Sequence, residues 1–195
     1  MEPEIFLIEL KSDKSDSAFD TLFLCADRNK QQQINRMKIK TDKDMSLTGY
    51  WLAKLAIEKV FGVSMADISF EVEESGKPYT AGYPDVHFNI SHSGSAVICA
   101  VCDKPVGIDI QLVKDRNFDL LAKRAFTEKE QKVFFSAQPD RRREQFFSIW
   151  TAKESYIKFS GAGVKDLKKD IDKSCVVRTY RFSNDYMVSV CTAAG

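Results

Sequence analysis

The sequence predicts an α+β fold in which a helix followed by a small antiparallel sheet occurs twice. A strongly periodic helix at 46–61 is followed by strand-like segments that short turns separate. The second half repeats this order, with helices up to about residue 159 and then two strands. A doubly wound parallel sheet would instead alternate single strands with helices. We therefore predict a pseudo-duplicated molecule whose halves, 1–104 and 105–195, pack closely together.

In the first half, residues 5–10 predict an opening strand, and weaker helical patterns follow at 17–24 and 30–37. The helix at 46–61 can be capped by Asp44 or Ser46, and Gly62 ends it. Alternation and turn signals then predict strands at 68–72, 86–90, 96–102 and 106–112, the last of which opens the second half.

In the second half, a helix is expected after Asn117 and another from Thr127. Thr127 and Glu130 have the spacing of a capping box, in which each side chain satisfies a backbone N–H of the other residue. A third helix is predicted at 140–159 and ends near Gly161. Strands at 175–180 and 186–191 complete the pattern.

Composition places the chain among ordinary globular proteins. Hydrophobic residues make up 44% and charged residues 29% of the 195, and the net charge is +1. Basic residues are in excess only in the second half, which hints at an anionic partner there. The five cysteines are an odd number and the start of the chain does not resemble a secretory signal, so we expect reduced thiols in a cytoplasmic protein. No segment reaches the ~20 apolar residues of a membrane span.

The segment 106–112 is the most informative strand. With a period of two, its apolar residues share one face, and Gly107, Asp109 and Gln111 share the other. The glycine leaves room for something to approach beside the carboxylate and the amide. The alternative is an isolated aspartate at the solvent edge of a strand.

The helix at 140–159 carries the second polar group. Helical spacing places Glu154 and Lys158 on one face, together with Phe147 and Trp150. A surface ion pair is one interpretation, but the aromatic residues indicate the border of the core, where the pKa of a carboxylate can be shifted. Asp109 and Glu154, with an amide oxygen, form an oxygen donor set that suits Mg²⁺ and does not suit zinc.

Other candidate sites are weaker. Cys99 and Cys102 are three residues apart within one strand, so their thiols should point to opposite faces as small buried side chains. Two histidines are too few for a histidine-rich metal centre, and Ser91–His92 lacks a third member for a hydrolase triad. The basic run between Arg28 and Lys43 is either a solvated face or a phosphate-binding edge. Arg141–Arg143 are either solvated or dock an acidic protein.

Four segments in order resemble the motifs of Sfp-type 4′-phosphopantetheinyl transferases, and together they are highly specific. They are Gly76-Lys77-Pro78, Phe88-Asn89-Ile90-Ser91-His92-Ser93, Val106-Gly107-Ile108-Asp109-Ile110-Gln111 and Trp150-Thr151-Ala152-Lys153-Glu154-Ser155-Tyr156-Ile157-Lys158, followed by a glycine pair at Gly161 and Gly163. The resemblance implies two similar α+β halves with coenzyme A and Mg²⁺ between them. It also implies transfer of 4′-phosphopantetheine from coenzyme A to a serine hydroxyl of an acyl or peptidyl carrier protein, with release of 3′,5′-ADP.

The resemblance also implies roles for individual residues. Asp109 corresponds to the principal Mg²⁺ ligand, and Glu154 to a second ligand that can also take the serine proton. Lys158 would neutralise charge on the transferred phosphate. Further residues correspond to coenzyme-contacting positions or lie where the coenzyme phosphates are expected: Lys77, Ser91, His92 and Lys40.

Two positions depart from the family pattern. Many relatives have Glu where this chain has Gln111, so the metal site has one charge fewer, although an amide oxygen can still act as a ligand directly or through water. Many also have Arg where this chain has Met45, so Arg36, Lys40 or Lys43 would have to replace that contact.

Three functions remain distinguishable. The first is an active transferase, which acts as a monomer in the simplest case. The second is a non-catalytic module that binds coenzyme A or a carrier protein, and the two departures motivate it. The third is a nucleic-acid-binding module, which the near-zero net charge opposes.

Overall fold

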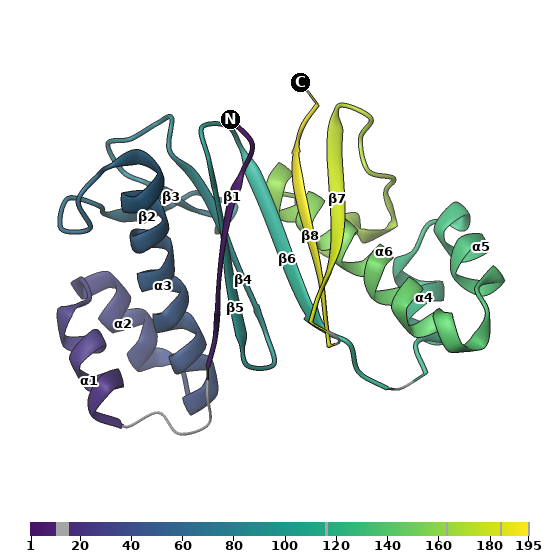
Figure 1. The fold of residues 1–195 in the computed structure, drawn as a ribbon, viewed down its shortest axis with the longest axis horizontal. Helices are drawn as coiled ribbons and strands as arrows, with labels where there is room; N and C mark the ends of the chain where they lie inside the picture. Colours follow the sequence, from purple (N-terminus) through teal and green to yellow (C-terminus); the bar gives the residue numbers. More distant parts are fainter. Residues whose placement is uncertain (11–15, 116, 163, 184, 195) are drawn as a thin grey trace.

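The computed structural model describes residues 1–10, 16–115, 117–162, 164–183 and 185–194 (Figure 1). Gly163, the second glycine of the pair after the long C-terminal helix, lies outside the described residues. The described chain contains helices and antiparallel sheets, which confirms the α+β class. No helix in the described ranges is long and apolar enough to cross a membrane.

The first half contains strands and helices close to the predicted ones. In chain order they are β1 (Glu4–Glu9), α1 (Asp16–Cys25), α2 (Arg28–Arg36), α3 (Lys40–Phe61), β2 (Phe70–Val72), β3 (Pro78–Thr80), β4 (His87–Ser93) and β5 (Ala96–Cys102). The short strand β3, which pairs with β2, was not predicted.

The predicted start of α3 is wrong. The helix begins six residues earlier, and neither Asp44 nor Ser46 caps it, since Ile39 holds the N-cap position without a side-chain hydrogen bond. Ser46 lies inside the helix, where its Oγ accepts a hydrogen bond from Lys30 Nζ at 2.8 Å. The predicted end is confirmed, because Gly62 closes α3 in the left-handed conformation at φ 71°.

The second half consists of β6 (Val106–Leu112), α4 (Asp119–Ala125), α5 (Glu128–Ser136), α6 (Pro139–Ser160), the 3₁₀ helix η1 (Val164–Lys168), β7 (Cys175–Phe182) and β8 (Tyr186–Ala193). The capping box at the start of α5 is confirmed, with both reciprocal bonds between Thr127 and Glu130 present. Pro139 occupies the first turn of α6, where a missing N–H costs nothing.

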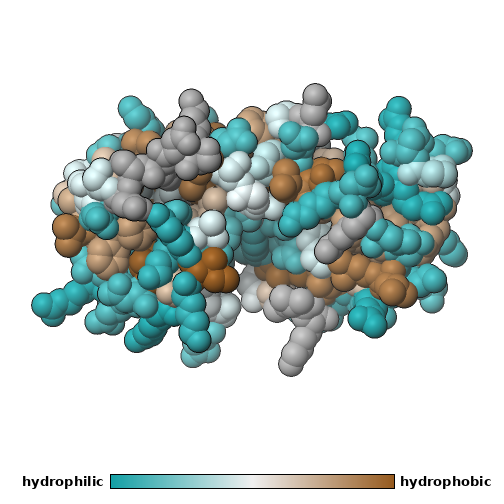
Figure 2. All heavy atoms as spheres, turned by 90° about the horizontal axis from the view of Figure 1, so that it is seen from below, coloured by the Kyte–Doolittle hydropathy of each residue, from teal (hydrophilic) through white to brown (hydrophobic). Residues whose placement is uncertain are grey.

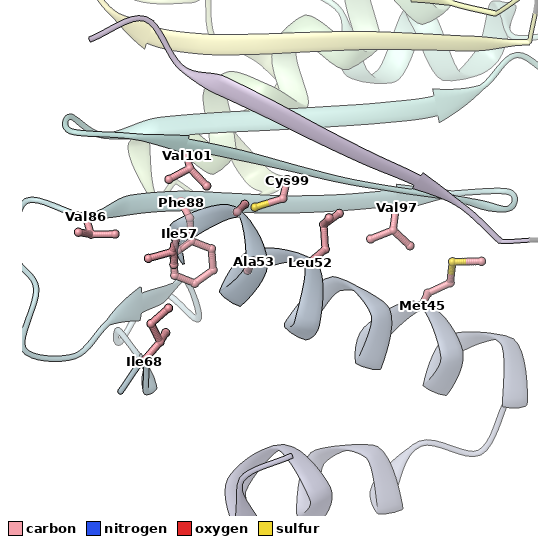
Figure 3. Close-up of a cluster of buried hydrophobic side chains, with 11 residues drawn as sticks. Met45, Leu52, Ala53, Ile57, Ile68, Val86, Phe88, Val97, Cys99 and Val101 are labelled. Atoms are coloured by element: carbon pink, nitrogen blue, oxygen red, sulfur yellow. The ribbon is translucent and has the colours of Figure 1, made fainter. Parts of the chain in front are cut away.

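Two three-stranded sheets lie between the two long helices (Figure 1). In each of these sheets one strand precedes the long helix in the chain and two follow it, and the strand orders are β1-β5-β4 and β6-β8-β7. Helix α3 covers one face of the first sheet, where Leu52, Ile57 and Phe88 belong to a buried apolar cluster (Figure 3). The other face of that sheet packs against β6 and β8.

Strand β5 is buried along its whole length because both of its faces are covered. Cys99 faces the cluster under α3, and Cys102 faces the cluster between the sheets, as the odd spacing predicts. All five cysteines are free thiols. Seen from below, hydrophilic side chains cover most of the surface, and a furrow separates the two parts of the molecule (Figure 2).

Candidate active site

Helix α6 reaches β6 because Gly107 has no side chain. A Cβ at this position would lie 2.1 Å from Ser155 O and 2.4 Å from Phe159 N, so any larger residue would push the helix away. The space that the sequence indicates beside Asp109 is therefore filled by the backbone of α6. This close contact brings Lys158, which lies between Ser155 and Phe159 in the helix, to the polar face of β6.

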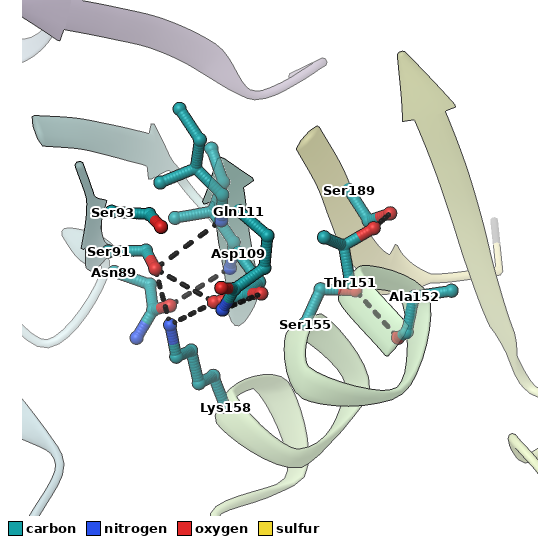
Figure 4. Close-up of polar contacts among 12 residues, drawn as sticks. Asn89, Ser91, Ser93, Asp109, Gln111, Thr151, Ala152, Ser155, Lys158 and Ser189 are labelled. Atoms are coloured by element: carbon teal, nitrogen blue, oxygen red, sulfur yellow. Dashed lines mark hydrogen bonds and ion pairs between the residues drawn. The ribbon is translucent and has the colours of Figure 1, made fainter. Parts of the chain in front are cut away.

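Asp109 is the centre of a buried polar network on that face (Figure 4). Its Oδ1 accepts hydrogen bonds from Ser91 Oγ at 2.8 Å and from Lys158 Nζ at 2.8 Å, and Lys158 Nζ also donates to Ser91 Oγ at 2.7 Å. Its Oδ2 accepts a bond from Gln111 Nε2 at 3.2 Å. The carboxylate is thus held in one orientation by residues of β4, β6 and α6, not left isolated at a strand edge.

Glu154 lies one turn before Lys158 on α6 and lines the same cavity as Asp109. Burial raises the pKa of the Glu154 carboxyl above its ordinary value, the charge of Asp109 raises it further, and Lys158 opposes both effects. Lys158 forms its ion pair with Asp109 across the two elements, so the alternative of a simple surface pair within the helix does not hold.

These groups line a cavity of about 530 Å³. One side is polar and holds six residues that the sequence singled out: Ser91, His92, Asp109, Gln111, Glu154 and Lys158. The rest of the lining is apolar and includes Phe147 and Trp150 of α6 and Phe118, the N-cap residue of α4. Such a cavity combines charged groups with partial exclusion of water, which strengthens electrostatic interactions.

A second cavity of about 470 Å³ adjoins the first, since Ile90 and His92 of β4 line both. It lies between α2, α3 and the first sheet, and Lys30 points its ammonium group to Ser46 Oγ and Gln33 Oε1. Burial lowers the pKa of Lys30 to about 8, although Asp27 opposes the shift. Tyr50 donates a hydrogen bond to Asp27 Oδ2 at 2.8 Å in the same place.

Sequence reasoning missed Lys30, Ser46 and the apolar residues Phe118 and Leu121 as cavity-lining groups. The basic run from Arg28 to Lys43 contained a signal for Lys30, but a run of charges does not tell which one points inward. Only the packing of α2 against α3 selects it.

Two predicted coenzyme-contacting residues lie outside both cavities. Lys77 Nζ donates to Val106 O at 3.4 Å and Phe159 O at 3.3 Å, and it lines a smaller cavity of about 240 Å³ at the other end of β6. Lys40 is the exposed first residue of α3 and lines neither of the two adjoining cavities.

The three neighbouring arginines of α6 point in different directions. Arg141 lines a groove beside β7, and Arg142 donates to the carbonyl oxygens of Phe135 and Ala137. Arg143 Nη1 lies 3.7 Å from Asp115 Oδ1, and Arg143 is on the same helix face as Phe147. The run is therefore not one continuous basic surface.

The described residues contain no group of three or more His, Cys, Asp or Glu side chains arranged to hold a metal ion. Asp109 and Glu154 are two carboxylates facing one cavity, and Gln111 adds a neutral amide. This oxygen-only set matches the ligands of Mg²⁺, which usually keeps one or two protein carboxylates and takes the remaining ligands from water and substrate phosphates.

Two family models match the chain. Residues 13–104 match the N-terminal 4′-phosphopantetheinyl transferase model, and residues 105–188 match that of the 4′-phosphopantetheinyl transferase superfamily. The second match contains Asp109, Gln111, Glu154 and Lys158.

Individual relatives agree with the family models. A 4′-phosphopantetheinyl transferase of Bacillus subtilis is 37% identical over 191 residues, which cover 89% of this chain and 85% of the relative. The 4′-phosphopantetheinyl transferase Sfp of Bacillus subtilis strain 168 is 33% identical over 181 residues, with 84% and 80% covered. A Xenopus laevis L-aminoadipate-semialdehyde dehydrogenase-phosphopantetheinyl transferase is 31% identical over 153 residues, with 72% and 51% covered.

Proposed function

Because the chain belongs to the 4′-phosphopantetheinyl transferase superfamily, we propose that the cavity around Asp109 is the active site of a holo-carrier-protein synthase. The enzyme transfers 4′-phosphopantetheine from coenzyme A to a serine hydroxyl of a carrier protein and releases 3′,5′-ADP. The observation that carries this proposal is the convergence of Asp109, Glu154 and Lys158 on one cavity from a strand and a helix.

The two adjoining cavities suit a long, anionic substrate. We assign the nucleotide end of coenzyme A to the second cavity, where Lys30 supplies a partly buried cation and Ser46 a hydroxyl. The diphosphate would then lie near His92, between the cavities, and the phosphorus to be transferred near Asp109. Cations that meet phosphates in a partly enclosed site stabilise the charge that spreads over them during transfer.

Asp109 and Glu154 are the residues that would hold a Mg²⁺ ion. Both offer carboxylate oxygens to the same cavity, and substrate phosphate oxygens and water would provide the other ligands. When bound, the ion neutralises charge on the phosphates and orients them. Gln111 has a separate task in this arrangement, because its Nε2 holds Asp109 Oδ2 while its Oε1 remains available as a neutral ligand, directly or through water.

The serine oxygen of the carrier attacks the phosphorus that bears pantetheine. A new P–O bond forms to serine, and the P–O bond to 3′,5′-ADP breaks. Glu154 takes the serine proton, directly or through water, and its raised pKa makes it a stronger base than an exposed carboxylate. Lys158 balances the negative charge on the phosphate, and Ser91 and Asp109 hold its ammonium group in position.

The division into halves at 104 and 105 belongs to the same proposal. Each half has a three-stranded sheet built from one strand before the long helix and two after it, in the same order, which supports an origin by duplication. Lys77 donates hydrogen bonds to backbone carbonyl oxygens of β6 and α6. We propose that these bonds support the coenzyme site by holding the two halves together. Lys40, exposed at the start of α3, would attract the coenzyme phosphates from solution.

Release of 3′,5′-ADP tests the function. The protein, coenzyme A and Mg²⁺ are incubated with an apo carrier protein or with the same carrier whose acceptor serine is replaced by alanine. We expect 3′,5′-ADP only with the serine-containing carrier, and we expect EDTA to stop its release. Binding of coenzyme A without release for any of several carriers would favour the non-catalytic binding module instead.

A further inference from the structure

Strand β6 has one backbone edge that pairs with no other strand among the described residues. Its other edge pairs with β8 in the second sheet, and β4, on the uncovered side, belongs to the first sheet. The N–H groups along such an edge need partners when they are buried, because a buried unpaired donor is costly.

Side chains of the first half supply those partners. Ile108 N donates to Asn89 Oδ1 at 2.9 Å, Ile110 N to Ser91 Oγ at 3.4 Å, and Leu112 N to Ser93 Oγ at 3.0 Å. Figure 4 shows Asn89, Ser91 and Ser93 in a row along β4 beside β6. We call these three residues the side-chain ladder.

The ladder has a fixed register. Each pair is separated by the same 19 residues, so β4 and β6 run in the same direction and alternate residues of one meet alternate N–H groups of the other. A shift by one residue would turn the three polar side chains away from β6. A shift by two would place Ser91 opposite Ile108 and separate its hydroxyl from Asp109.

The register has a consequence for the active site. The middle member of the ladder, Ser91, also donates to Asp109 Oδ1 and accepts from Lys158 Nζ. His92, which lines both adjoining cavities, lies between Ser91 and Ser93 on the same strand. Asp109 and Lys158 belong to the second half, whereas the cavity lined by Lys30 belongs to the first half. The ladder therefore fixes the position of Asp109 and Lys158 relative to that cavity.

We propose that Asn89 and Ser93 are positioning residues for phosphopantetheinyl transfer, because they set the register between the halves that share the substrate. The positioning role rests on the proposed function, whereas the three hydrogen bonds of the ladder do not depend on it. Neither residue lines the adjoining cavities, so each acts through Ser91 and β6, not through a substrate contact.

Variants at Ser93 and Asn89 test the proposal, together with one matched control. Ser93→Ala removes the acceptor for Leu112 N, and Ser93→Thr retains a hydroxyl. The matched control is Ser189→Ala. Ser189 is fully buried, whereas Ser93 is half-buried. Ser189 pairs with Asp109 in the sheet, but its hydroxyl partners, Thr151 and Thr179, lie within the second half.

We expect Ser93→Ala to raise the hydrogen-exchange rate of the Leu112 amide. The same variant should lower kcat/KM for coenzyme A about tenfold or more, when activity is measured well below the melting temperature of the variant. Ser93→Thr should restore both quantities, and Ser189→Ala should change neither even if it lowers the melting temperature as much. Asn89→Ala removes the acceptor for Ile108 N, so it should raise the exchange rate of the Ile108 amide and lower kcat/KM for coenzyme A in the same way.

Two results would overturn the proposal. One is faster Leu112 exchange in Ser93→Ala with an unchanged kcat/KM, which would leave the ladder a purely structural feature. The other is unchanged Leu112 exchange, which would contradict the ladder itself. If the wild-type protein transfers nothing, the proposed function fails, and the positioning role falls with it; the exchange rates then still decide whether the ladder exists.

Discussion

Asp109 is buried, yet each of its carboxylate oxygens has a partner. Oδ1 is held by Ser91 and Lys158, and Oδ2 by Gln111. Loss of one such partner in a buried network costs about 1–3 kcal/mol, since the remaining group is left without its hydrogen bond. The side chains around Asp109 thus fix its orientation before any substrate arrives.

Gln111→Glu tests how this position contributes. The variant replaces an amide donor with a carboxylate and raises the negative charge of the oxygen donor set. We expect the Mg²⁺ concentration for half-maximal activity to fall or stay the same, because a carboxylate binds Mg²⁺ more strongly than an amide. Loss of all activity at saturating Mg²⁺ would mean that the hydrogen bond from Nε2 to Asp109 is the essential contribution.

Lys30 predicts a pH dependence for coenzyme binding. Its pKa is lowered to about 8, so it is charged at lower pH and becomes neutral as the pH rises through that value. Affinity for the anionic coenzyme should therefore fall between about pH 7 and 9. Calorimetric titrations across this range measure the effect. Lys30→Arg is the control, since arginine stays charged, and an equally steep fall in that variant would exclude Lys30 as the cause.

At the scale of elements, α6 unites the apolar and polar sides of the site. One helix face of α6 carries a cation, two aromatic rings and the two proposed catalytic groups. Its residues follow one another at intervals of three or four: Arg143, Phe147, Trp150, Glu154 and Lys158. The position of this face depends on the contact between Gly107 and the helix backbone.

Gly107→Ala should disrupt that contact. The new Cβ would overlap Ser155 O and Phe159 N, which are backbone atoms of α6 that cannot rotate away. We expect a loss of about 1–3 kcal/mol in the free energy of unfolding and a larger relative loss of transfer, as Lys158 moves from Asp109. Urea unfolding and transfer rates measure the two effects. A fully active and fully stable variant would show that α6 is not held by this contact.

Charge reversal in α6 tests carrier docking. Arg143 is on the helix face that leads to the proposed active site, whereas Arg141 lines a groove beside β7. We expect Arg143→Glu to raise the KM for an acidic carrier and to leave the KM for coenzyme A unchanged, because like charges repel the carrier. Arg141→Glu, which makes the same charge change, should have a smaller effect. Equal effects of the two variants on the carrier KM would contradict docking along this face.

At the scale of the whole molecule, the sequence predicted the elements well, and it also identified six residues of the first cavity. Alternation along 106–112 and helical spacing around Glu154 are local signals. They were sufficient to predict which side chains of β6 and α6 face the cavity. The direction of Lys30, the side-chain ladder and the placement of Lys77 depend on how the halves meet, which no local pattern records. The early start of α3 was missed because it has no side-chain cap to mark it.

Intact-mass analysis of an apo carrier protein tests the central claim most directly. The carrier is incubated with coenzyme A, Mg²⁺ and the wild-type protein, Asp109→Asn or Glu154→Gln, after circular dichroism has shown that both variants fold. We predict that the wild-type protein adds the mass of one phosphopantetheine group and that both variants leave the carrier unchanged. The same mass gain with Asp109→Asn or Glu154→Gln would contradict the assigned roles, and no gain with the wild-type protein across several carriers would contradict the function.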